Sequence, residues 1–202
     1  FYTHTPPHAM LRSLVGSEMC IRDRGGAVWA APKCSSWIFM STSQSKRSNT
    51  NPAGDKNVRW VREGNEIAKR TVALLMLAAS LGAFIYMEQP VSSYLVKAEP
   101  GRSFIKTFAQ YSVTTSLGAF GAETQKSIKV WSNDPACSKL KRLPGRHMAT
   151  LTHRGTGGSV TGIKDIMTAS QAYPKEFGKT YGKIVASNFH HYLLKSTFTQ
   201  VF

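Results

Sequence analysis

The sequence predicts an α/β fold with an incomplete sheet and helices packed on it. Two apolar runs, Gly25–Lys33 and Ala83–Met87, are each short enough to be a buried strand. A segment with helical spacing lies between them. A strand, a covering helix and a second strand in this order are typical of α/β sheets.

The helix between the two strands is predicted from the spacing of its inward-facing residues. They recur at steps of three and four, at Val58, Val61, Asn65, Ala68, Val72, Leu75 and Ala79. Asp55 or Asn57 could cap the start of this helix, and Gly82 could end it. The preceding residues 34–57 are rich in Ser, Asn and Lys and are predicted to form a long loop.

The apolar stretch Thr71–Met87 admits a second interpretation, since it is close to the roughly 17–25 residues that span a bilayer. Helix plus strand is favoured because the periodicity begins before Thr71, in a charged segment. Gly82 also interrupts the stretch, and the aromatic and β-branched residues follow it, as a strand requires. A small single-span membrane protein with a basic tail is the alternative.

The second half of the chain has weaker patterns. They predict a stretch of mixed helix and strand signals, a strand, a basic loop and a glycine-rich turn or hairpin. These segments are, in order, Phe104–Thr115, Ser127–Trp131, Lys139–His147 and Arg154–Gly162. Pro174 is predicted to open a last helix whose buried face would hold Phe177, Tyr181 and Ile184.

The first residues do not have the character of an evolved protein. Residues 13–24 (SLVGSEMCIRDR) resemble the translation, in one frame, of an adapter used in transposon-based sequencing libraries. Residues 1–24 are therefore expected to be artefactual and disordered, and are excluded from the interpretation of the fold. The domain is expected to cover residues 25–188, followed by a tail over residues 189–202.

The chain carries a formal net charge of +15 over 202 residues. This charge favours polyanionic partners, nucleic acid first and an acidic membrane surface second. Outside the excluded residues the cysteines are Cys34 and Cys137, which do not indicate a disulfide scaffold and leave room for a reactive thiol. His190 and His191 have no further ligand at a suitable spacing, so no metal site is predicted.

The order of strand, Pro-x-Cys turn, long loop, helix, strand and acidic turn resembles the catalytic half of cytosine-5 DNA methyltransferases and their diverged relatives. The two turns are residues 32–36 (PKCSS) and 88–90 (EQP). Residues 118–133 are similar to the family's later strand pair, and residues 171–185 to its closing segment, where a helix that begins with Pro packs on the sheet. The resemblance implies an incomplete Rossmann-like methyltransferase sheet.

The resemblance also implies roles for individual residues. Cys34 would be the nucleophile, and Glu88 the acid that holds the base. In this chemistry a thiolate adds to C6 of cytosine, so that C5 can attack a methyl donor, while the carboxyl group keeps N3 protonated. The base must leave the duplex to reach both groups. The expected phosphate contacts are Lys46, Arg47, Lys139, Lys141 and Arg142.

The chain departs from the family pattern at several places. Lys33 stands where the family has Pro, Gln89-Pro90 replaces Asn-Val, and an arginine motif expected near Ser112–Ser116 is absent. The glycine-rich loop that binds S-adenosylmethionine belongs to the family's first strand, and no such loop precedes Ala27. The first strands are therefore expected to be missing. S-adenosylmethionine would serve the complete protein, and this chain is expected to bind no cofactor.

Two functions follow from the resemblance, beside the membrane alternative. The first is a fragment of a nucleic-acid cytosine methyltransferase-like protein, with DNA as the expected partner. The second is a catalytically inactive relative that binds nucleic acid through its basic surface. The enzymatic interpretation requires Cys34 and Glu88 to lie at the ends of neighbouring strands and face a common cavity.

Overall fold

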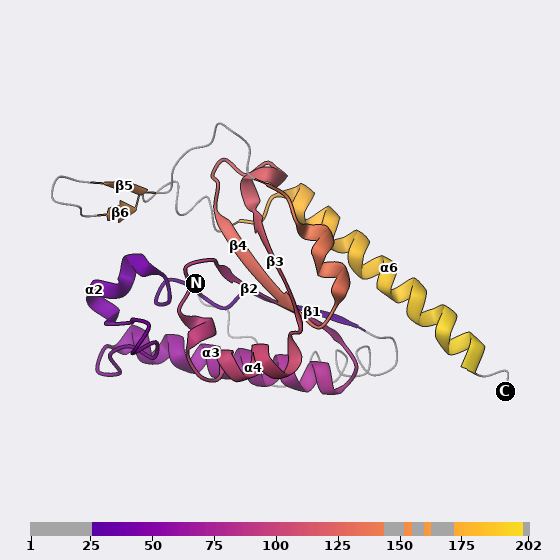
Figure 1. Ribbon diagram of the computed structural model, residues 1–202, viewed down its shortest axis with the longest axis horizontal. Helices are drawn as coiled ribbons and strands as arrows, with labels where there is room; N and C mark the ends of the chain where they lie inside the picture. Colours follow the sequence, from indigo (N-terminus) through magenta and orange to yellow (C-terminus); the bar gives the residue numbers. More distant parts are fainter. Residues whose placement is uncertain (1–25, 144–151, 155–159, 163–171, 200–202) are drawn as a thin grey trace, which may run out of the picture.

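A four-stranded sheet forms the centre of the computed structural model, which describes residues 26–143, 152–154, 160–162 and 172–199 (Figure 1). The strands, in the order β1-β2-β4-β3, are β1 (Ala27–Ala30), β2 (Phe84–Pro90), β4 (Ser127–Ser132) and β3 (Tyr111–Ser116). β1 and β2 are parallel, whereas β4 runs antiparallel to both of its neighbours. The chain is therefore a mixed α/β protein, as the sequence predicts at this level.

β1, α3 (Arg59–Ser80) and β2 form the predicted strand–helix–strand unit. Gly82 has a φ of +84°, a left-handed conformation that ends helices and favours glycine. The stretch Thr71–Met87 is thus divided between the end of a helix and a strand, which confirms the favoured interpretation. The buried face of α3 consists of Val61, Gly64, Ala68, Val72, Leu75 and Ala78. Within the described part of the chain, no helix combines the length and apolar character needed to cross a membrane.

The start of α3 differs from the prediction. Val58 occupies the N-cap position in an extended conformation, and no side chain caps the helix there. Oδ1 of Asp55 instead accepts a hydrogen bond from the backbone N–H of Asn57 at 2.9 Å. The predicted cap at Asp55 or Asn57 is wrong, because this aspartate closes a turn just before the helix.

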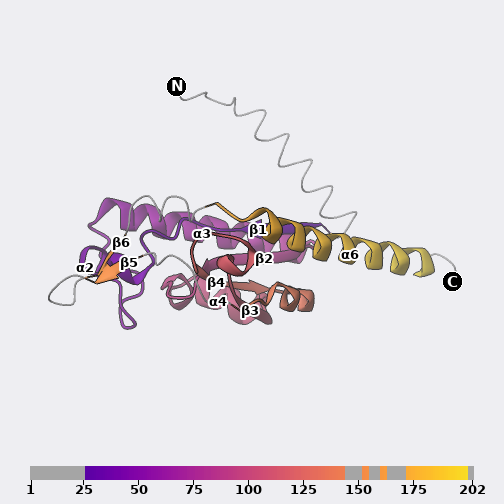
Figure 2. The same cartoon turned by 90° about the horizontal axis from the view of Figure 1, so that it is seen from above.

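The sheet separates two apolar cores, because successive side chains of a strand point to opposite faces. Ile85 and Met87 of β2 pack with residues of α3 and α4 (Gly101–Phe108) on one face. Tyr86 packs on the other face with residues of β4, the 3-10 helices η3 (Leu117–Phe120) and η4 (Pro135–Leu140), and α6 (Lys175–Thr199). Figures 1 and 2 show α6 extending well beyond the sheet.

α6 begins directly after Pro174, as predicted, and covers the second core. Phe177 and Ile184 are buried in this core, and Tyr181 is partly buried against it. The helix continues to Thr199, beyond the domain boundary expected at residue 188.

A buried polar contact fastens α6 to the sheet. Oδ2 of Asp134 accepts hydrogen bonds from the hydroxyl of Tyr86 and from the amide of Asn188, the latter at 2.6 Å. Oδ1 of Asp134 accepts from the backbone N–H of Ala136 at 2.8 Å and caps η4. One carboxylate therefore links β2, η4 and α6.

The long loop after β1 is folded. It contains the 3-10 helix η1 (Phe39–Ser41) and the short helix α2 (Thr42–Ser45). Gly54 has a φ of +70°, and a Cβ atom at this position would lie 2.6 Å from the carbonyl oxygen of Ser45. The loop therefore turns back on itself at a point where only glycine fits.

The remaining segments explain the weaker sequence patterns. The mixed signals of Phe104–Thr115 arise because α4 ends within this stretch and β3 begins there. β5 (Thr152–Arg154) and β6 (Val160–Gly162) pair as an antiparallel hairpin in the glycine-rich segment. The basic loop Lys139–His147 begins within η4, and its residues 144–147, like residues 1–24, lie outside the described residues.

Candidate active site

Cys34 lies in the loop after β1, and hydrogen bonds fasten this loop to the end of β2. Gln89 is buried and donates from Nε2 to the carbonyl oxygen of Pro32 at 2.6 Å. Oε1 of Gln89 accepts from the hydroxyl of Ser93 at 2.9 Å. The carbonyl oxygen of Cys34 accepts from the N–H of Trp37 at 2.8 Å and closes a turn. The glutamine that departs from the family pattern thus positions the cysteine turn.

Glu88 precedes Gln89 on β2 and points to the opposite face of the sheet, toward the core that α6 covers. It is only 4% exposed. Oε2 accepts a hydrogen bond from the hydroxyl of Tyr173 at 2.6 Å, whereas Oε1 is buried and has no hydrogen-bond partner within the described residues. Burial raises the pKa of Glu88 above its usual range, against the opposing effects of Tyr173 and Lys126.

The thiol of Cys34 and the carboxyl group of Glu88 influence each other electrostatically. Burial is the main cause that raises the pKa of Cys34, and the charge of Glu88 raises it further, while Lys126 lowers it. Burial, Glu88 and, more weakly, Cys34 raise the pKa of Tyr173. These electrostatic effects link Cys34, Glu88, Lys126 and Tyr173, and the hydroxyl of Tyr173 contacts Glu88 directly. The catalytic roles of Cys34 and Glu88 remain predictions.

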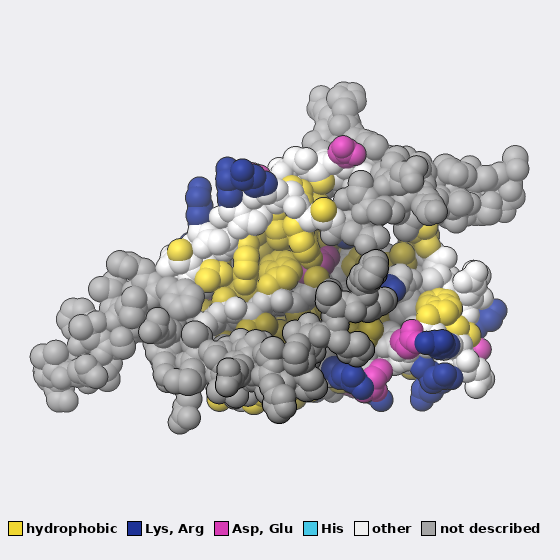
Figure 3. Space-filling model, turned by 180° about the vertical axis from the view of Figure 1, so that it is seen from behind, with side chains coloured by type: hydrophobic (Ala, Val, Ile, Leu, Met, Phe, Trp, Pro, Cys, Tyr) yellow, Lys and Arg dark blue, Asp and Glu magenta, His cyan; other side chains and the backbone are white. Residues whose placement is uncertain are grey.

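Aromatic rings pack against the ring of Tyr173. Its ring stacks on Phe177 with centroids 5.3 Å apart and an interplanar angle of 16°. Trp29 of β1 meets Tyr173 edge to face at 5.9 Å and 90°. Figure 3 shows apolar side chains gathered across the back of the molecule, with lysines and arginines near the margins.

The sequence does not single out Tyr173 or Lys126. Glu88 and Tyr173 are 85 positions apart, so only the fold brings them together. Lys126 directly precedes β4 and lies within the stretch 118–133 that resembles the family's later strand pair. The available signal for Tyr173 was its place in the stretch that resembles the closing segment of the family.

Arg47, which was predicted to contact phosphate, is buried, with only 2% of its surface exposed. Its guanidinium donates to the carbonyl oxygens of Ser36 and Pro52, each at 2.7 Å, and to Oδ1 of Asn65 at 2.9 Å. It also lies 3.5 Å from the ring centroid of Trp37, and burial lowers the pKa of Arg47 to about 10. The predicted phosphate contact at Arg47 is wrong, since its donors are directed into the loop.

The predicted lysine contacts lie at opposite edges of the sheet. Lys46 is exposed in the loop that follows the edge strand β1. Lys139 and Lys141 are exposed in and after η4, which packs against β3, the edge strand on the other side. The structure does not bring these lysines into one patch, and their contacts with phosphate remain predictions.

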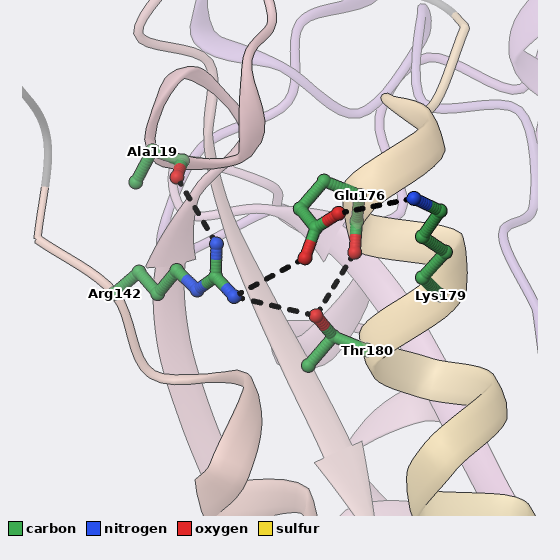
Figure 4. Close-up of polar contacts among 5 residues, drawn as sticks. All are labelled: Ala119, Arg142, Glu176, Lys179 and Thr180. Carbon is green, nitrogen blue, oxygen red and sulfur yellow. Dashed lines mark hydrogen bonds and ion pairs between the residues drawn. The ribbon is translucent and has the colours of Figure 1, made fainter.

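Arg142 connects the sheet to α6 (Figure 4). Its Nη2 lies 3.8 Å from Oε1 of Glu176 and donates to Oγ1 of Thr180 at 3.4 Å. Nη1 donates to the carbonyl oxygen of Ala119 at 3.5 Å, and the guanidinium lies 4.2 Å from the ring centroid of Phe120. A phosphate at Arg142 would therefore have to compete with a carboxylate.

The turns after the two parallel strands do not fit S-adenosylmethionine. The resemblance places its cradle in a glycine-rich turn after a strand, but the turns after β1 and β2, residues 31–36 and 91–94, contain no glycine. The closely packed Gly54, Gly64 and Gly101 meet atoms of the chain's own side chains or backbone, so they leave no space for a ligand. No step through a methyl donor is derived from these residues.

Comparisons with protein-family models, with curated proteins and with solved structures find no match for this chain. The geometry around Cys34 and Glu88 is therefore the basis for a functional proposal.

Proposed function

We propose that this chain is the base-binding part of a nucleic-acid cytosine methyltransferase-like protein, in which Cys34 adds to the target base and Glu88 holds it. The observation that carries this proposal is the buried, unpartnered Oε1 of Glu88 near a partly buried thiol. A buried polar atom without a partner is rare in folded proteins, which suggests that a ligand completes the contact. Cytosine offers an acceptor nitrogen for Oε1 and an electrophilic carbon for sulfur.

The arrangement of the sheet supports the same proposal. Cys34 and Glu88 belong to the carboxyl ends of two adjacent parallel strands, where open α/β sheets bind their ligands. The net charge of +15 suits a polyanionic substrate. DNA is the proposed partner.

The covalent step balances between this chain and the base. Cys34 releases its proton to solvent, and the thiolate sulfur forms a bond with C6 of the ring. The C5–C6 π pair becomes a C4–C5 double bond, and the C4–N3 π pair takes the proton from Oε1 of Glu88. The reverse movements release the base unchanged.

A DNA oligonucleotide with one 2-pyrimidinone in place of cytosine tests this step. The missing amino group makes C6 more electrophilic, so an adduct can accumulate without a methyl donor. We expect the full chain to form an adduct that survives denaturation, Cys34→Ser to form none, and the matched control Cys137→Ser to form it normally. Equal trapping by Cys34→Ser would exclude Cys34 as the nucleophile, and no adduct with the unaltered chain would reject the covalent function.

A nucleic-acid-binding module without covalent chemistry is the second candidate. It is favoured by the raised pKa of Cys34, caused mainly by burial, because thiolate is then scarce at neutral pH. This candidate predicts no adduct, together with binding to a fluorescent oligonucleotide that weakens steeply between about 50 and 200 mM salt. Binding that changes little with salt would contradict it.

A further inference from the structure

We propose that Tyr173 keeps the proton of Glu88 on Oε1, and that this makes the site select a base with an exocyclic amino group over one with a keto group. The inference rests on the proposed function, because it concerns the base that Cys34 and Glu88 would hold. Tyr173 is a positioning residue in this scheme, since it acts through Glu88.

The two carboxyl oxygens of Glu88 are not equivalent. Oε2 accepts from the hydroxyl of Tyr173 at 2.6 Å, whereas Oε1 is buried without a partner among the described residues. The ring of Tyr173 is held between Phe177, on which it stacks, and the edge of Trp29. Tyr173 is 37% exposed overall, but its hydroxyl contacts the buried carboxyl group.

This asymmetry decides where a proton on Glu88 resides. A neutral carboxyl group has one O–H donor and one carbonyl oxygen, which is the better acceptor. Burial and the neighbouring Glu88 raise the pKa of Tyr173, so its phenol stays protonated and acts as the donor to Oε2. Oε2 is then the carbonyl oxygen of neutral Glu88, and the proton lies on Oε1.

The position of the proton determines which base edge fits. Cytosine presents an acceptor at N3 beside an amino group at C4, which matches an O–H donor beside a carbonyl oxygen. Uracil presents a donor at N3 beside a carbonyl at C4. Binding uracil would therefore require the proton of Glu88 to lie on Oε2. Moving the proton to Oε2 would weaken the bond from Tyr173, because the hydroxyl oxygen of a carboxyl group is a poorer acceptor than its carbonyl oxygen. A bidentate match of this kind discriminates about 10- to 100-fold between bases.

The test compares Tyr173→Phe, which keeps the ring and removes the hydroxyl, with the matched control Tyr181→Phe. Tyr181 also packs on Trp29, with ring centroids 4.9 Å apart. The first readout is infrared spectroscopy of the full chain without DNA. The carbonyl stretch of neutral Glu88 is recorded on the acidic side of its folded pKa and identified by its loss in Glu88→Gln. It should move to higher frequency in Tyr173→Phe and stay in place in Tyr181→Phe.

The second readout is base selection. Trapping of the 2-pyrimidinone oligonucleotide is competed by otherwise identical strands with cytosine or uracil at the same position. The unaltered chain and Tyr181→Phe should prefer cytosine by about 10- to 100-fold, and Tyr173→Phe should lose most of this preference.

Each outcome is decisive. A carbonyl band that does not move in Tyr173→Phe overturns the inference, whether or not an adduct forms. A shifted band with an unchanged preference overturns the role in base selection. No adduct with the unaltered chain rejects the proposed function and base selection with it, and the infrared band then decides on the proton position alone.

Discussion

Arg47 and Glu88 are two charged side chains that the fold buries to a similar extent, at 2% and 4% exposed. Their surroundings differ. The guanidinium of Arg47 reaches two carbonyl oxygens and an indole ring of the loop, and the amide oxygen of Asn65 in α3. Glu88 has one oxygen bonded to Tyr173 and the other without a partner in the described residues.

The difference separates a structural charge from a candidate functional one. A buried charge stabilises a fold only when the surrounding groups replace its lost hydration. Arg47 meets this condition with groups of its own chain, so it is expected to hold the loop. Glu88 does not, so its burial is expected to reduce stability until a ligand completes the contact.

The largest effect should come from Arg47→Ala, which tests the structural side of this comparison. We expect the free energy of unfolding to fall by about 3–5 kcal/mol, because the carbonyl groups of Ser36 and Pro52 lose a charged donor. Urea denaturation followed by tryptophan fluorescence measures this change. The exposed neighbour Lys46 supplies the control, since Lys46→Ala should change stability by less than about 0.5 kcal/mol. Equal losses in the two variants would contradict the structural role.

Glu88→Gln should stabilise the folded chain in the absence of a ligand, by about 1–3 kcal/mol. Burial raises the folded pKa of Glu88 above the ordinary value of 4.5, so the folded state binds the proton more tightly than the unfolded state. The contribution of Glu88 to stability is therefore most favourable below the unfolded pKa and decreases as the pH rises through the folded pKa.

The gain from Glu88→Gln should therefore be small near about pH 4 and largest on the alkaline side of the folded pKa. Denaturant unfolding across this range measures it. Glu63→Gln, at an exposed position of α3, is the control and should show little dependence on pH. A gain of the same size at every pH would show that burial of the charge is not the cause.

A smaller effect should appear in the reactivity of Cys34. Because the charge of Glu88 raises the pKa of Cys34, Glu88→Gln should speed alkylation by iodoacetamide by about 2- to 10-fold at a pH above the folded pKa of Glu88, where the carboxyl group is ionised. The measurement uses a chain with Cys20→Ser and Cys137→Ser, so that only Cys34 is labelled. Glu123→Gln, at an exposed position, should leave the rate unchanged. An unaltered rate in Glu88→Gln would show that the charge of Glu88 does not affect the thiol of Cys34.

The smallest effect is expected at Glu176. Its ion pair with Arg142 is 3.8 Å long, and both side chains are substantially exposed, at 47% and 39%. Exposed pairs of this kind contribute little, so Glu176→Ala should lower the free energy of unfolding by at most about 0.5 kcal/mol. If Glu176→Ala lowered the free energy of unfolding as much as Arg47→Ala, burial would not explain why the contacts of Arg47 stabilise the fold more.

The strand–helix–strand unit could be predicted from the sequence because its signals are local. The spacing of Val61, Ala68, Val72 and Leu75 defines the buried face of α3, and Gly82 separates the helix from β2. The sheet order could not be predicted in this way. β4 pairs between β2 and β3, and this choice depends on contacts between distant segments.

In the loop and at the site, contacts between residues far apart in the sequence could not be predicted either. Arg47 belongs to a polar stretch typical of an exposed loop, but its partners Ser36 and Asn65 are 11 and 18 positions away. The positions of Cys34 after β1 and of Glu88 near the end of β2 could be predicted, because both follow from the order of two parallel strands. That of Tyr173 could not be predicted, because its bond to Glu88 exists only after α6 has packed on the sheet.

β1 has a consequence for the behaviour of the chain in solution. Within the described residues it pairs with β2 along one side and with no strand along the other. Its sequence, AVWA, contains neither the charges nor the proline with which proteins usually discourage pairing at such a border. Its unpaired amide and carbonyl groups are a template for a strand from another molecule. Concentrated samples are therefore expected to form oligomers through this border, and dilution should return them to monomers.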